Sequence, residues 1–496
     1  MKKVVIIGGG VAGLSAGIYA RKAGFEAAVY EKNAVVGGQC TGWKRKGYVI
    51  DNCIHWLTGT KKDTPLYELW EDLGVLGDNI DVIQPELFYT AELNGQQVSL
   101  WRDLDKTERE MLSISPEDEL EIKKFISATR LAESMDMPIE KPMDMMNVLE
   151  YLSLGKSMSG MMKVMKEYGK INIGDLKNRF KHPLLKSLMG DYLPNEYVAF
   201  SLIVSYATIT SGNGGIPRGG SLEMALRMKK RLEELGGKVF TNAEVKKVKL
   251  DSDNHASGII LKNGRMVKAD YVICACDTDF TFKQLLDKKY MDKKMEKAYE
   301  DYNNHAVFSG CQVAFSVDGA FEDLHTYFFD CEEISAGTQK YNRMSIKNYG
   351  YEPAFAPKGK TIIQSNFTQY EEDYEYWMKL YSDKKKYQEC KNAFGNKVLK
   401  RIEDKFPEYK GKLEILDVWT PATYNRYCNS YKGSYMSFIT TKEGNNPRFK
   451  GILKGLDNVF IAGQWLMAPG GLPTAAATGK FSIQRILKKE KRSIEI

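Results

Sequence analysis

Several features that are common in other protein classes are missing from this 496-residue sequence. None of its eight cysteines forms a CxxC pair, which argues against a zinc ribbon or a thioredoxin-type dithiol. No apolar run approaches the roughly 20 residues that cross a bilayer as a helix. The net charge of +7 lacks the concentration of a nucleic-acid-binding patch. We therefore expect no metal site and no nucleic-acid partner.

The length and composition indicate a globular protein of two or more domains. The chain is too long for one ordinary core, and 43% hydrophobic with 27% charged residues is typical of water-soluble proteins. A strand pattern begins at the third residue and leaves no room for a signal peptide, so we expect a cytoplasmic location with reduced thiols. The basic run from Lys480 to Arg492 indicates either a solvated helix end or contact with an anionic membrane surface.

The first forty residues have the pattern of a unit that binds an ADP group. An apolar, β-branched strand leads into a turn in which Gly8, Gly10 and Gly13 have GxGxxG spacing. The first two glycines permit a tight turn and a close approach to a pyrophosphate, and the third allows the following helix to pack on the strand. The first N–H groups of that helix, near Val11 and Ala12, are then available to the phosphates.

The second strand of the unit ends at Glu31, at about the position where such folds place an acid on the ribose hydroxyls. A carboxylate there repels a 2′-phosphate, so NADP is disfavoured. The adjacent Lys32 is included in the predicted cofactor site. This unit alone does not distinguish FAD from NAD, because both contain an ADP group.

Two further segments extend the predicted site. Gly37, Gly38 and Gln39 follow soon after the ribose acid and indicate another close approach of the backbone to the cofactor. Near the C-terminus, a buried strand passes through a glycine- and proline-rich junction into a small-residue helix, which offers a second helix N-terminus. The cofactor-binding residues predicted in this segment are Gly463, Gln464, Gly471, Leu472 and Pro473.

These elements resemble the FAD-binding parts of the phytoene desaturase family, which includes carotenoid desaturases, carotenoid isomerases and retinol saturase. The C-terminal segment is similar to that family's Asn-x-(apolar)-Ala-Gly … Pro-Gly-Gly-x-Pro motif. A third match begins at Ile216-Pro217-Arg218-Gly219-Gly220-Ser221 and continues through a helix and several strands. In the family, the residue that matches Val245 contacts the adenine through its backbone. The resemblance implies that FAD is the cofactor.

The resemblance also implies an α/β fold in two parts. A discontinuous Rossmann-type FAD-binding domain, with a parallel sheet and a β-meander, is expected from 1–75, 215–285 and 450–496. An α+β substrate-binding domain is expected from 76–214 and 286–449. Two residues depart from the family pattern: Gln39 stands where relatives often carry an Arg, and Gln464 stands where they often carry an acid. Both glutamines can still donate and accept hydrogen bonds.

The region between the nucleotide motifs is rich in methionine. Nine methionines lie between 135 and 165. They fit an adaptable wall or a membrane-facing entrance for a long apolar substrate, and they fit a helical core equally well. In the same region Ser115 and Pro116 predict the start of a helix that continues over 120–132.

Three residues are candidates for contact with the substrate. His55 is one of only five histidines and follows a strand that is expected to run beside the flavin. It fits a proton donor or substrate contact, and it fits equally a histidine bonded within its own loop. Tyr424, or Tyr427 in its place, could donate a hydrogen bond at the flavin face, and Arg426 could hold a substrate carboxylate or the flavin. Aromatic residues at such places more often serve packing, so a structural role is favoured for this second segment.

The leading functional hypothesis is an FAD-dependent enzyme that adds or removes hydrogen across carbon–carbon bonds of a polyene or other lipid-like, apolar small molecule. The same site chemistry would allow a redox-neutral isomerase or an amine-oxidase-like flavoenzyme. A carrier without flavin on the same fold is the least favoured alternative. No second GxGxxG follows a strand, so no built-in NAD(P)H site is indicated. The sequence leaves the electron partner and membrane association open.

Overall fold

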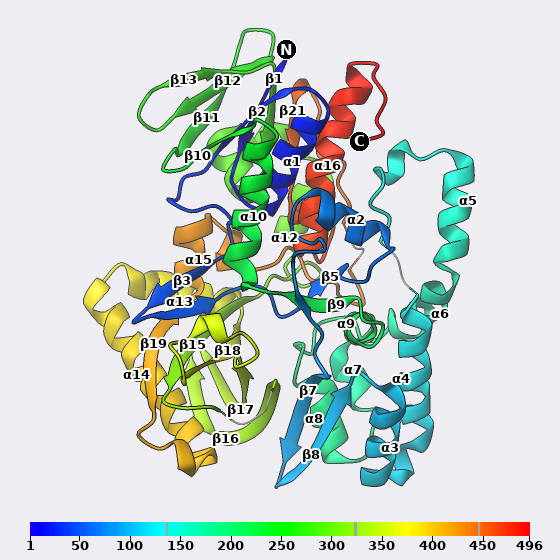
Figure 1. The fold of residues 1–496 in the computed structure, drawn as a ribbon, viewed down its shortest axis with the longest axis vertical. Helices are drawn as coiled ribbons and strands as arrows, with labels where there is room; N and C mark the ends of the chain where they lie inside the picture. The colour runs from blue at the N-terminus through cyan, green and yellow to red at the C-terminus, as the bar shows by residue number, and fades with distance from the viewer. Residues whose placement is uncertain (135–136, 322–324, 445–446) are drawn as a thin grey trace.

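The computed structural model describes residues 1–134, 137–321, 325–444 and 447–496. Figure 1 shows the N- and C-termini at the same end of the molecule, with two lobes at the opposite end. One lobe is built around a large sheet and the other is mostly helical. In the described part of the chain, no helix is long and apolar enough to cross a membrane. Met135 belongs to the methionine cluster but lies outside the described residues.

A six-stranded sheet at the end that carries the termini takes its strands from three distant parts of the sequence (Figure 1). Its order is β10-β2-β1-β14-β21-β20, and all neighbours are parallel except β20, which is antiparallel to β21. The central strand β1 is apolar and buried, as expected for a parallel strand with both faces covered. The strands are β1 (Lys3–Ile7), β2 (Glu26–Tyr30), β10 (Lys238–Phe240), β14 (Tyr271–Cys274), β20 (Ile452–Leu453) and β21 (Leu456–Ile461).

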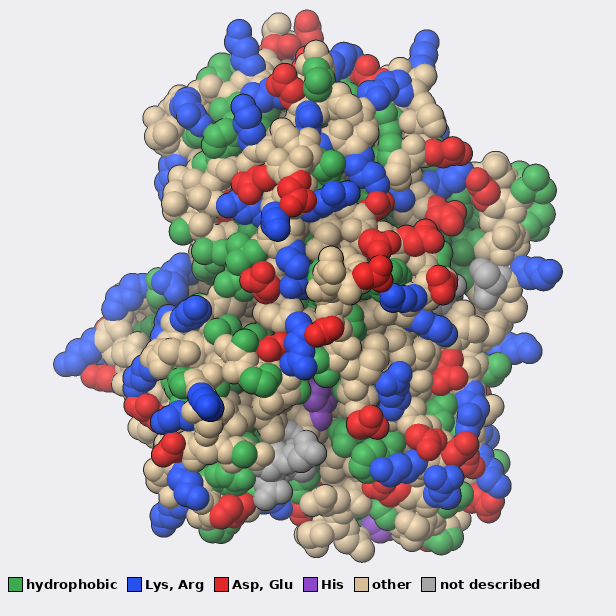
Figure 2. All heavy atoms as spheres, viewed as in Figure 1, with side chains coloured by type: hydrophobic (Ala, Val, Ile, Leu, Met, Phe, Trp, Pro, Cys, Tyr) green, Lys and Arg blue, Asp and Glu red, His purple; other side chains and the backbone are tan. Residues whose placement is uncertain are grey.

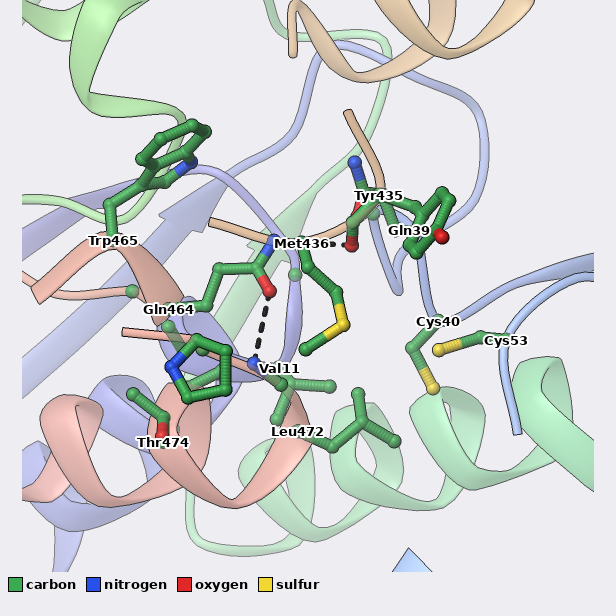
Figure 3. Close-up of a pocket in the computed structure, with 18 of the residues that line it drawn as sticks. Val11, Gln39, Cys40, Cys53, Tyr435, Met436, Gln464, Trp465, Leu472 and Thr474 are labelled. Carbon is green, nitrogen blue, oxygen red and sulfur yellow. Dashed lines mark hydrogen bonds between the residues drawn. The ribbon is translucent and has the colours of Figure 1, made fainter. Parts of the chain in front are cut away.

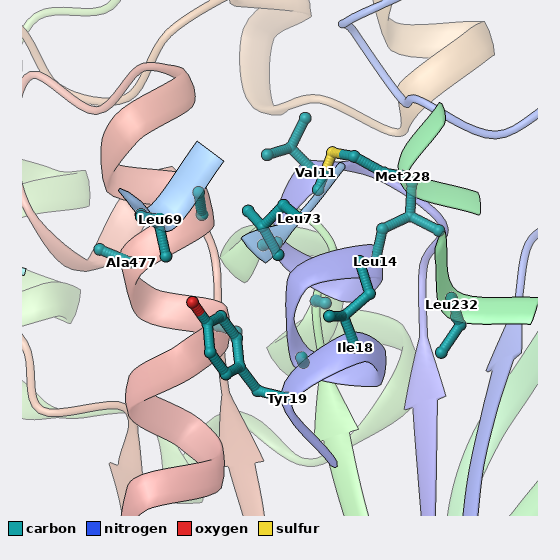
Figure 4. Packing of buried hydrophobic residues seen from close by; sticks show 14 of the residues in the cluster. Val11, Leu14, Ile18, Tyr19, Leu69, Leu73, Met228, Leu232 and Ala477 are labelled. Atoms are coloured by element: carbon teal, nitrogen blue, oxygen red, sulfur yellow. The ribbon is translucent and has the colours of Figure 1, made fainter. Parts of the chain in front are cut away.

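The two faces of this sheet have different covers. On one face Val4 and Ile6 join a core with helices α1, α2, α10 and α16, and Figure 4 shows Leu14, Ile18 and Tyr19 of α1 at its centre. On the other face Val5 and its neighbours pack against a three-stranded meander. The helices are α1 (Val11–Lys22), α2 (Pro65–Asp72), α10 (Gly220–Glu234) and α16 (Leu472–Lys489), and the meander is β11 (Val245–Leu250), β12 (Ala256–Leu261) and β13 (Met266–Lys268).

A seven-stranded sheet forms the second lobe, in the order β19-β15-β18-β17-β16-β7-β8. One face packs against α13 and α14, where Trp377 and Val398 join the same core as Val313 and Phe315. The opposite face carries polar side chains toward the first sheet. The elements are β7 (Leu87–Leu93), β8 (Gln96–Trp101), β15 (Ser309–Val317), β16 (Thr326–Ala336), β17 (Gln339–Asn348), β18 (Thr361–Gln369), β19 (Leu413–Trp419), α13 (Glu371–Tyr381) and α14 (Lys384–Lys405).

The helical lobe lies beside β7 and β8, and α5 and α6 form its outer edge in Figure 1. Its helices are α3 (Leu104–Ile114), α4 (Glu119–Ala132), α5 (Val148–Ser157), α6 (Ser159–Tyr168), α7 (Ile173–Lys177), α8 (Pro183–Gly190) and α9 (Phe200–Thr210). Short elements connect the parts: β3 (Gly42–Arg45), β4 (Tyr48–Asp51), β5 (Leu57–Thr58), β6 (Val82–Ile83), β9 (Gly214–Pro217), α11 (Thr278–Phe280), α12 (Lys293–Glu300) and α15 (Pro421–Cys428).

The α/β fold class is confirmed, including the parallel sheet and the meander. The predicted helix start was confirmed in position, because Ser115 precedes a helical turn whose first residue is Pro116, but the Ser115 side chain does not cap that turn. Ser115 Oγ donates to Asp118 Oδ2 at 2.8 Å, residues Pro116–Asp118 form a short 3₁₀ turn, and α4 begins only at Glu119. The domain boundaries given above stay a prediction, although the first sheet does draw on all three segments assigned to the FAD-binding domain.

Candidate flavin and substrate site

A cavity of about 1100 Å³ lies between the two sheets. The carboxyl ends of the parallel strands border it, since Ile7, Tyr30 and Ile461, the last residues of β1, β2 and β21, all line the cavity. In open α/β sheets, ligands bind at this edge of the sheet. The cavity exceeds the usual size of a small-molecule pocket, so one space has room for a dinucleotide and a substrate.

Two helix N-termini converge on the cavity. Helix α1 begins after Gly10 and helix α16 begins after Gly471, and neither helix has a side-chain cap. Their first N–H groups are therefore free to bind an oxygen-rich ligand, and both helix dipoles favour a negative charge there. The two helices lie in contact, because Gly479 has no Cβ, and one added there would stand only 2.5 Å from Ala12 O. Such a pair of helix ends fits the pyrophosphate of a dinucleotide.

The three glycines of the GxGxxG turn have different neighbours. Gly8 has a φ of +104°, a conformation that L side chains rarely adopt. A Cβ on Gly13 would stand 1.9 Å from Gly8 O, so this glycine lets the helix pack on the turn. A Cβ on Gly10 would meet no protein atom closer than Gly37 O at 3.8 Å, because Gly10 faces the open cavity. Only this last glycine leaves room that a ligand could use.

Glu31 is held at the cavity wall by the backbone. Its Oε2 accepts a hydrogen bond from Gly9 N and its Oε1 accepts one from Asn33 N, both at 2.8 Å. Each carboxylate oxygen keeps capacity for another donor, as a ribose hydroxyl requires. Lys32 points elsewhere: its Nζ donates to Arg426 O at 3.0 Å and to Asn429 Oδ1 at 2.8 Å. Burial lowers the Lys32 pKa.

The two glutamines that depart from the family pattern support the backbone of the cavity wall (Figure 3). Gln464 Oε1 accepts a hydrogen bond from Gly471 N at 3.1 Å, and so fixes the loop before α16. Gln39 Nε2 donates to Ser434 O at 2.6 Å. Neutral amides thus anchor neighbouring backbone, and they bring no charge of their own to the site.

The predicted cofactor residues come together almost completely. Gly13 does not border the cavity, which agrees with its packing role. The others all line it: Gly8, Gly10, Val11, Ala12, Glu31, Lys32, Gly37, Gly38, Gln39, Val245, Gly463, Gln464, Gly471, Leu472 and Pro473. Their individual contacts with FAD stay a prediction.

Comparison with protein families matches residues 11–487 to the flavin-containing amine oxidoreductases. The chain belongs to this family. It is therefore an FAD-dependent oxidoreductase, and the free helix ends, the open space at Gly10 and the anchored Glu31 all fit that cofactor. When bound, FAD takes up or gives a hydride at its flavin ring.

The curated relatives are similar along nearly the whole chain. An all-trans-retinol 13,14-reductase of Danio rerio is 24% identical over 99% of this chain and 87% of the relative. A 4,4′-diaponeurosporene oxygenase of Staphylococcus haemolyticus is 23% identical over 98% of this chain and 97% of the relative. These relatives belong to the carotenoid and retinoid group that the sequence resembles.

Solved structures support the fold. An oxidoreductase of Methanosarcina mazei has a TM-score of 0.61 at 17% identity and covers 97% of this chain and 100% of its own. A mutant putrescine oxidase has a TM-score of 0.60 at 15% identity, with 98% of this chain and 99% of its own covered.

His55 of this oxidoreductase borders the cavity in the loop after β4, and its side chain is exposed to the cavity interior while protein surrounds it elsewhere. This burial lowers the His55 pKa well below its usual 6.5, and the nearby charges of Lys347 and His325 lower it further. His55 is neutral at neutral pH and serves there as a base or a hydrogen-bonding group.

Tyr424 also borders the cavity, but its hydroxyl is fully used by the protein. It donates to Asn52 Oδ1 at 3.0 Å and accepts from Gln312 Nε2 at 2.6 Å and Trp419 Nε1 at 3.1 Å. No proton is left for a flavin or substrate contact, so the geometry favours the structural role. Arg426 is exposed and does not line the cavity, and only its backbone carbonyl, which accepts from Lys32, connects it to the site.

The polar residues that the second lobe contributes to the cavity were not predicted from the sequence. Lys347, Gln364 and Asn366 lie on β17 and β18 and line the cavity, far in sequence from any nucleotide motif. The one signal was that Lys347 shares the polar side of an alternating apolar–polar stretch of β17 with Ser345. Strand alternation shows that such a residue shares a face with its second neighbours, but it does not identify that face as a cavity wall.

Proposed function

We propose that this FAD-dependent oxidoreductase adds or removes hydrogen across carbon–carbon bonds of a polyene or another lipid-like substrate. The observation that carries the proposal is the single cavity, which joins the flavin-binding residues to a chamber of the second lobe. A substrate in that chamber would lie against the flavin without crossing a barrier. The names of two relatives, a retinol reductase and a diaponeurosporene oxygenase, support a substrate of this class.

The aromatic residues in the wall of the chamber are evidence that the substrate is apolar. Trp56, Tyr192 and Phe328 line the chamber. Phe88 packs behind them, 5.2 Å from Trp56 and 4.5 Å from Tyr192 between ring centroids. Aromatic faces of this kind give a long apolar molecule a large contact area.

The charges of the chamber disfavour amine oxidation. An amine substrate binds as an ammonium ion or loses a proton on entry, and Lys347 already brings a buried positive charge to this space. Asp191 also borders the chamber, but Arg343 holds both of its carboxylate oxygens, at 2.8 and 2.6 Å. A redox-neutral isomerisation of the same substrates stays open as the second candidate, because it needs the same cavity.

The exposed apolar residues of the α5–α6 region are evidence that the substrate enters from a membrane surface. Val148 is 74%, Leu149 78% and Leu152 66% exposed, and Figure 2 shows apolar side chains gathered at the edge of this lobe. Tyr151 of the same helix lines the cavity, so the apolar patch is continuous with the substrate space. A patch of this kind on a monomer marks an interaction site.

The charge of the same helices suits an anionic lipid surface. Lys156, Lys163 and Lys166 are exposed, and none of them forms an ion pair with another described residue. Basic residues beside an apolar helix face are the pattern of interfacial membrane binding. We therefore assign α5 and α6 to docking on a bilayer with anionic head groups.

Electron exchange with the flavin tests the proposed reaction. The FAD-loaded enzyme is reduced without oxygen and mixed with conjugated polyenes, and the flavin absorbance is followed. Reoxidation by polyenes, with no response to saturated hydrocarbons of the same length, is the expected result. If polyenes leave both reduced and oxidised flavin unchanged and are not isomerised, the proposal fails.

Vesicle binding tests the docking surface separately. The double variant Leu149→Ser/Leu152→Ser should bind vesicles that contain phosphatidylglycerol at least about tenfold more weakly, because two apolar anchors are lost. The matched control is Leu120→Ser on α4, where the leucine is also highly exposed. An equal loss in both proteins, or no loss in either, would remove the assignment.

A further inference from the structure

Lys347 is a buried cation in the wall of the substrate chamber. It lies on β17, is 5% exposed and borders the cavity. Its Nζ donates to Ile54 O at 3.2 Å. The residue before Ile54 is Cys53, which lies beside Cys40 in the cavity wall in Figure 3. The same ammonium lies 5.0 Å from the ring centroid of Tyr349. Among the described residues, no carboxylate forms an ion pair with it.

The charge of Lys347 therefore lacks its usual compensation. The charge of Asp51 acts on Lys347, but the hydrogen bonds of Asp51 go elsewhere: Ser221 N and Ser221 Oγ each donate to it at 2.6 Å, and Cys53 N donates at 3.1 Å. A buried ammonium without a counter-ion is unfavourable, because no ion pair offsets the free energy of the hydration that it loses. Such groups persist where they serve a ligand or a reaction.

The neighbours of Lys347 add donors to the same wall. Gln364 is its direct partner across β17 and β18, and Thr326 is its partner on β16. Gln364 Oε1 accepts from Tyr349 OH at 3.2 Å, whereas Gln364 Nε2 is buried without a hydrogen-bond partner. All three residues line the cavity. A hydrocarbon would leave these donors unsatisfied, but an anionic oxygen would satisfy them.

We propose that Lys347 and Gln364 bind the carboxylate head group of an otherwise apolar substrate. The substrate class is then a long-chain unsaturated or polyene carboxylic acid, with its chain along the aromatic wall. This inference rests on the proposed function and narrows its substrate. It also replaces Arg426, which the sequence suggested for a carboxylate, by a residue that does border the cavity.

Ligand binding to the FAD-loaded enzyme tests the head-group site. A polyene acid, its methyl ester and the matching hydrocarbon are titrated, and flavin absorbance and tryptophan fluorescence are followed. The acid should bind at least about tenfold more tightly than the ester, and Lys347→Met should abolish this preference while ester affinity is retained. The matched control is Lys450→Met, since Lys450 also lines the cavity but is largely exposed and lies 3.6 Å from Asp144.

The pH dependence of the preference is a second readout. Burial lowers the Lys347 pKa to about 8, opposed by Asp51 and Cys53. His55 and His325 also face this ammonium, but burial lowers both of their pKa values, so they stay neutral above pH 7. The acid should therefore be preferred at pH 7, and the preference should fade as pH rises through about 8.

The outcomes separate the two proposals. Equal binding of acid and ester by the unchanged enzyme, or a preference that survives in Lys347→Met and Lys347→Gln, overturns the head-group site. If Lys347→Met loses FAD or shifts the flavin spectrum while the acid preference is unchanged, Lys347 serves the flavin and the inference is wrong. If the acid binds with the expected preference but never exchanges electrons with the flavin, only the proposed reaction fails.

Discussion

Ser15 and Ala476 are 461 positions apart in the sequence, yet Ser15 Oγ donates a hydrogen bond of 2.7 Å to Ala476 O. This bond joins α1 to α16, the two helices whose N-termini face the cavity. The flavin site is thus assembled from both ends of the chain. Its geometry depends on how closely these two helices approach.

We expect Gly479→Val to reduce FAD content strongly. Its Cβ would stand 2.5 Å from Ala12 O and 2.7 Å from Ser15 Cβ, so α16 must move away from α1 and the two helix ends no longer converge. The flavin absorbance of the purified protein measures the effect. The matched control is Gly155→Val in α5, where an added Cβ meets nothing within 4 Å. Equal FAD content in both variants would contradict the role of the helix contact.

Variants of the GxGxxG glycines should separate the effect on FAD binding from the effect on folding. Gly10→Val should leave the flavin-free protein stable, because Gly10 has an extended backbone and no protein atom within 3.5 Å of an added Cβ, but the side chain blocks the pyrophosphate. Gly13→Ala should lower the free energy of unfolding by at least about 2 kcal/mol, because its Cβ collides with Gly8 O. Thermal unfolding and flavin content distinguish them, and a fully yellow Gly10→Val protein would remove the assignment.

Much of the cofactor side of the site could be predicted because its signals are local. A tight turn, a close backbone approach and a helix start each demand particular residues at fixed spacing, and Gly8, Gly10 and Glu31 occupy those places. The C-terminal glycines gave the same kind of signal. The parallel sheet could also be predicted, because its strands are apolar, as is typical of strands that are buried on both faces.

The substrate side could not be predicted in the same way. Lys347 and Gln364 face each other only because β17 and β18 pair in one register, and His55 has a low pKa only because distant strands bury it. Arg426 looked as promising as Tyr424 in the sequence, but two positions along α15 place their side chains on opposite faces of the helix, and only Tyr424 borders the cavity. These properties depend on tertiary packing, which has no short sequence pattern.

Tyr424→Phe should affect stability and leave the reaction unchanged. Removal of the hydroxyl takes away the hydrogen bonds that it makes with Asn52 Oδ1, Gln312 Nε2 and Trp419 Nε1, which costs about 1–3 kcal/mol of unfolding free energy. Turnover per bound flavin should stay the same, since the hydroxyl has no proton to donate to a substrate. Thermal melts and turnover per flavin check both parts. A tenfold slower reaction at full flavin content would instead make Tyr424 a catalytic residue.

His55 is expected to act on the substrate from the cavity wall, and its low pKa determines the form in which it acts. His55→Ala should keep FAD content and fold, because the side chain borders the cavity and no hydrogen bond to a described residue holds it. The step that involves the organic substrate should slow by about a hundredfold, a common size for the loss of general acid–base catalysis. If His55 only supports its loop, thermal stability or flavin occupancy should fall while turnover per flavin is unchanged.

The pH profile then shows how His55 acts. A lowered pKa means that the neutral base predominates at neutral pH and is lost only as the pH falls through a value well below 6.5. With a polyene substrate that carries no carboxylate, kcat/KM for substrate oxidation should thus be flat around neutral pH and decline only well below pH 6.5, and His55→Gln should remove that acidic limb. Because glutamine can still donate a hydrogen bond, it should restore substrate affinity without restoring the rate if His55 transfers a proton. A glutamine variant with the full rate would show that His55 only orients the substrate, and an acidic limb that persists in this variant belongs to another group.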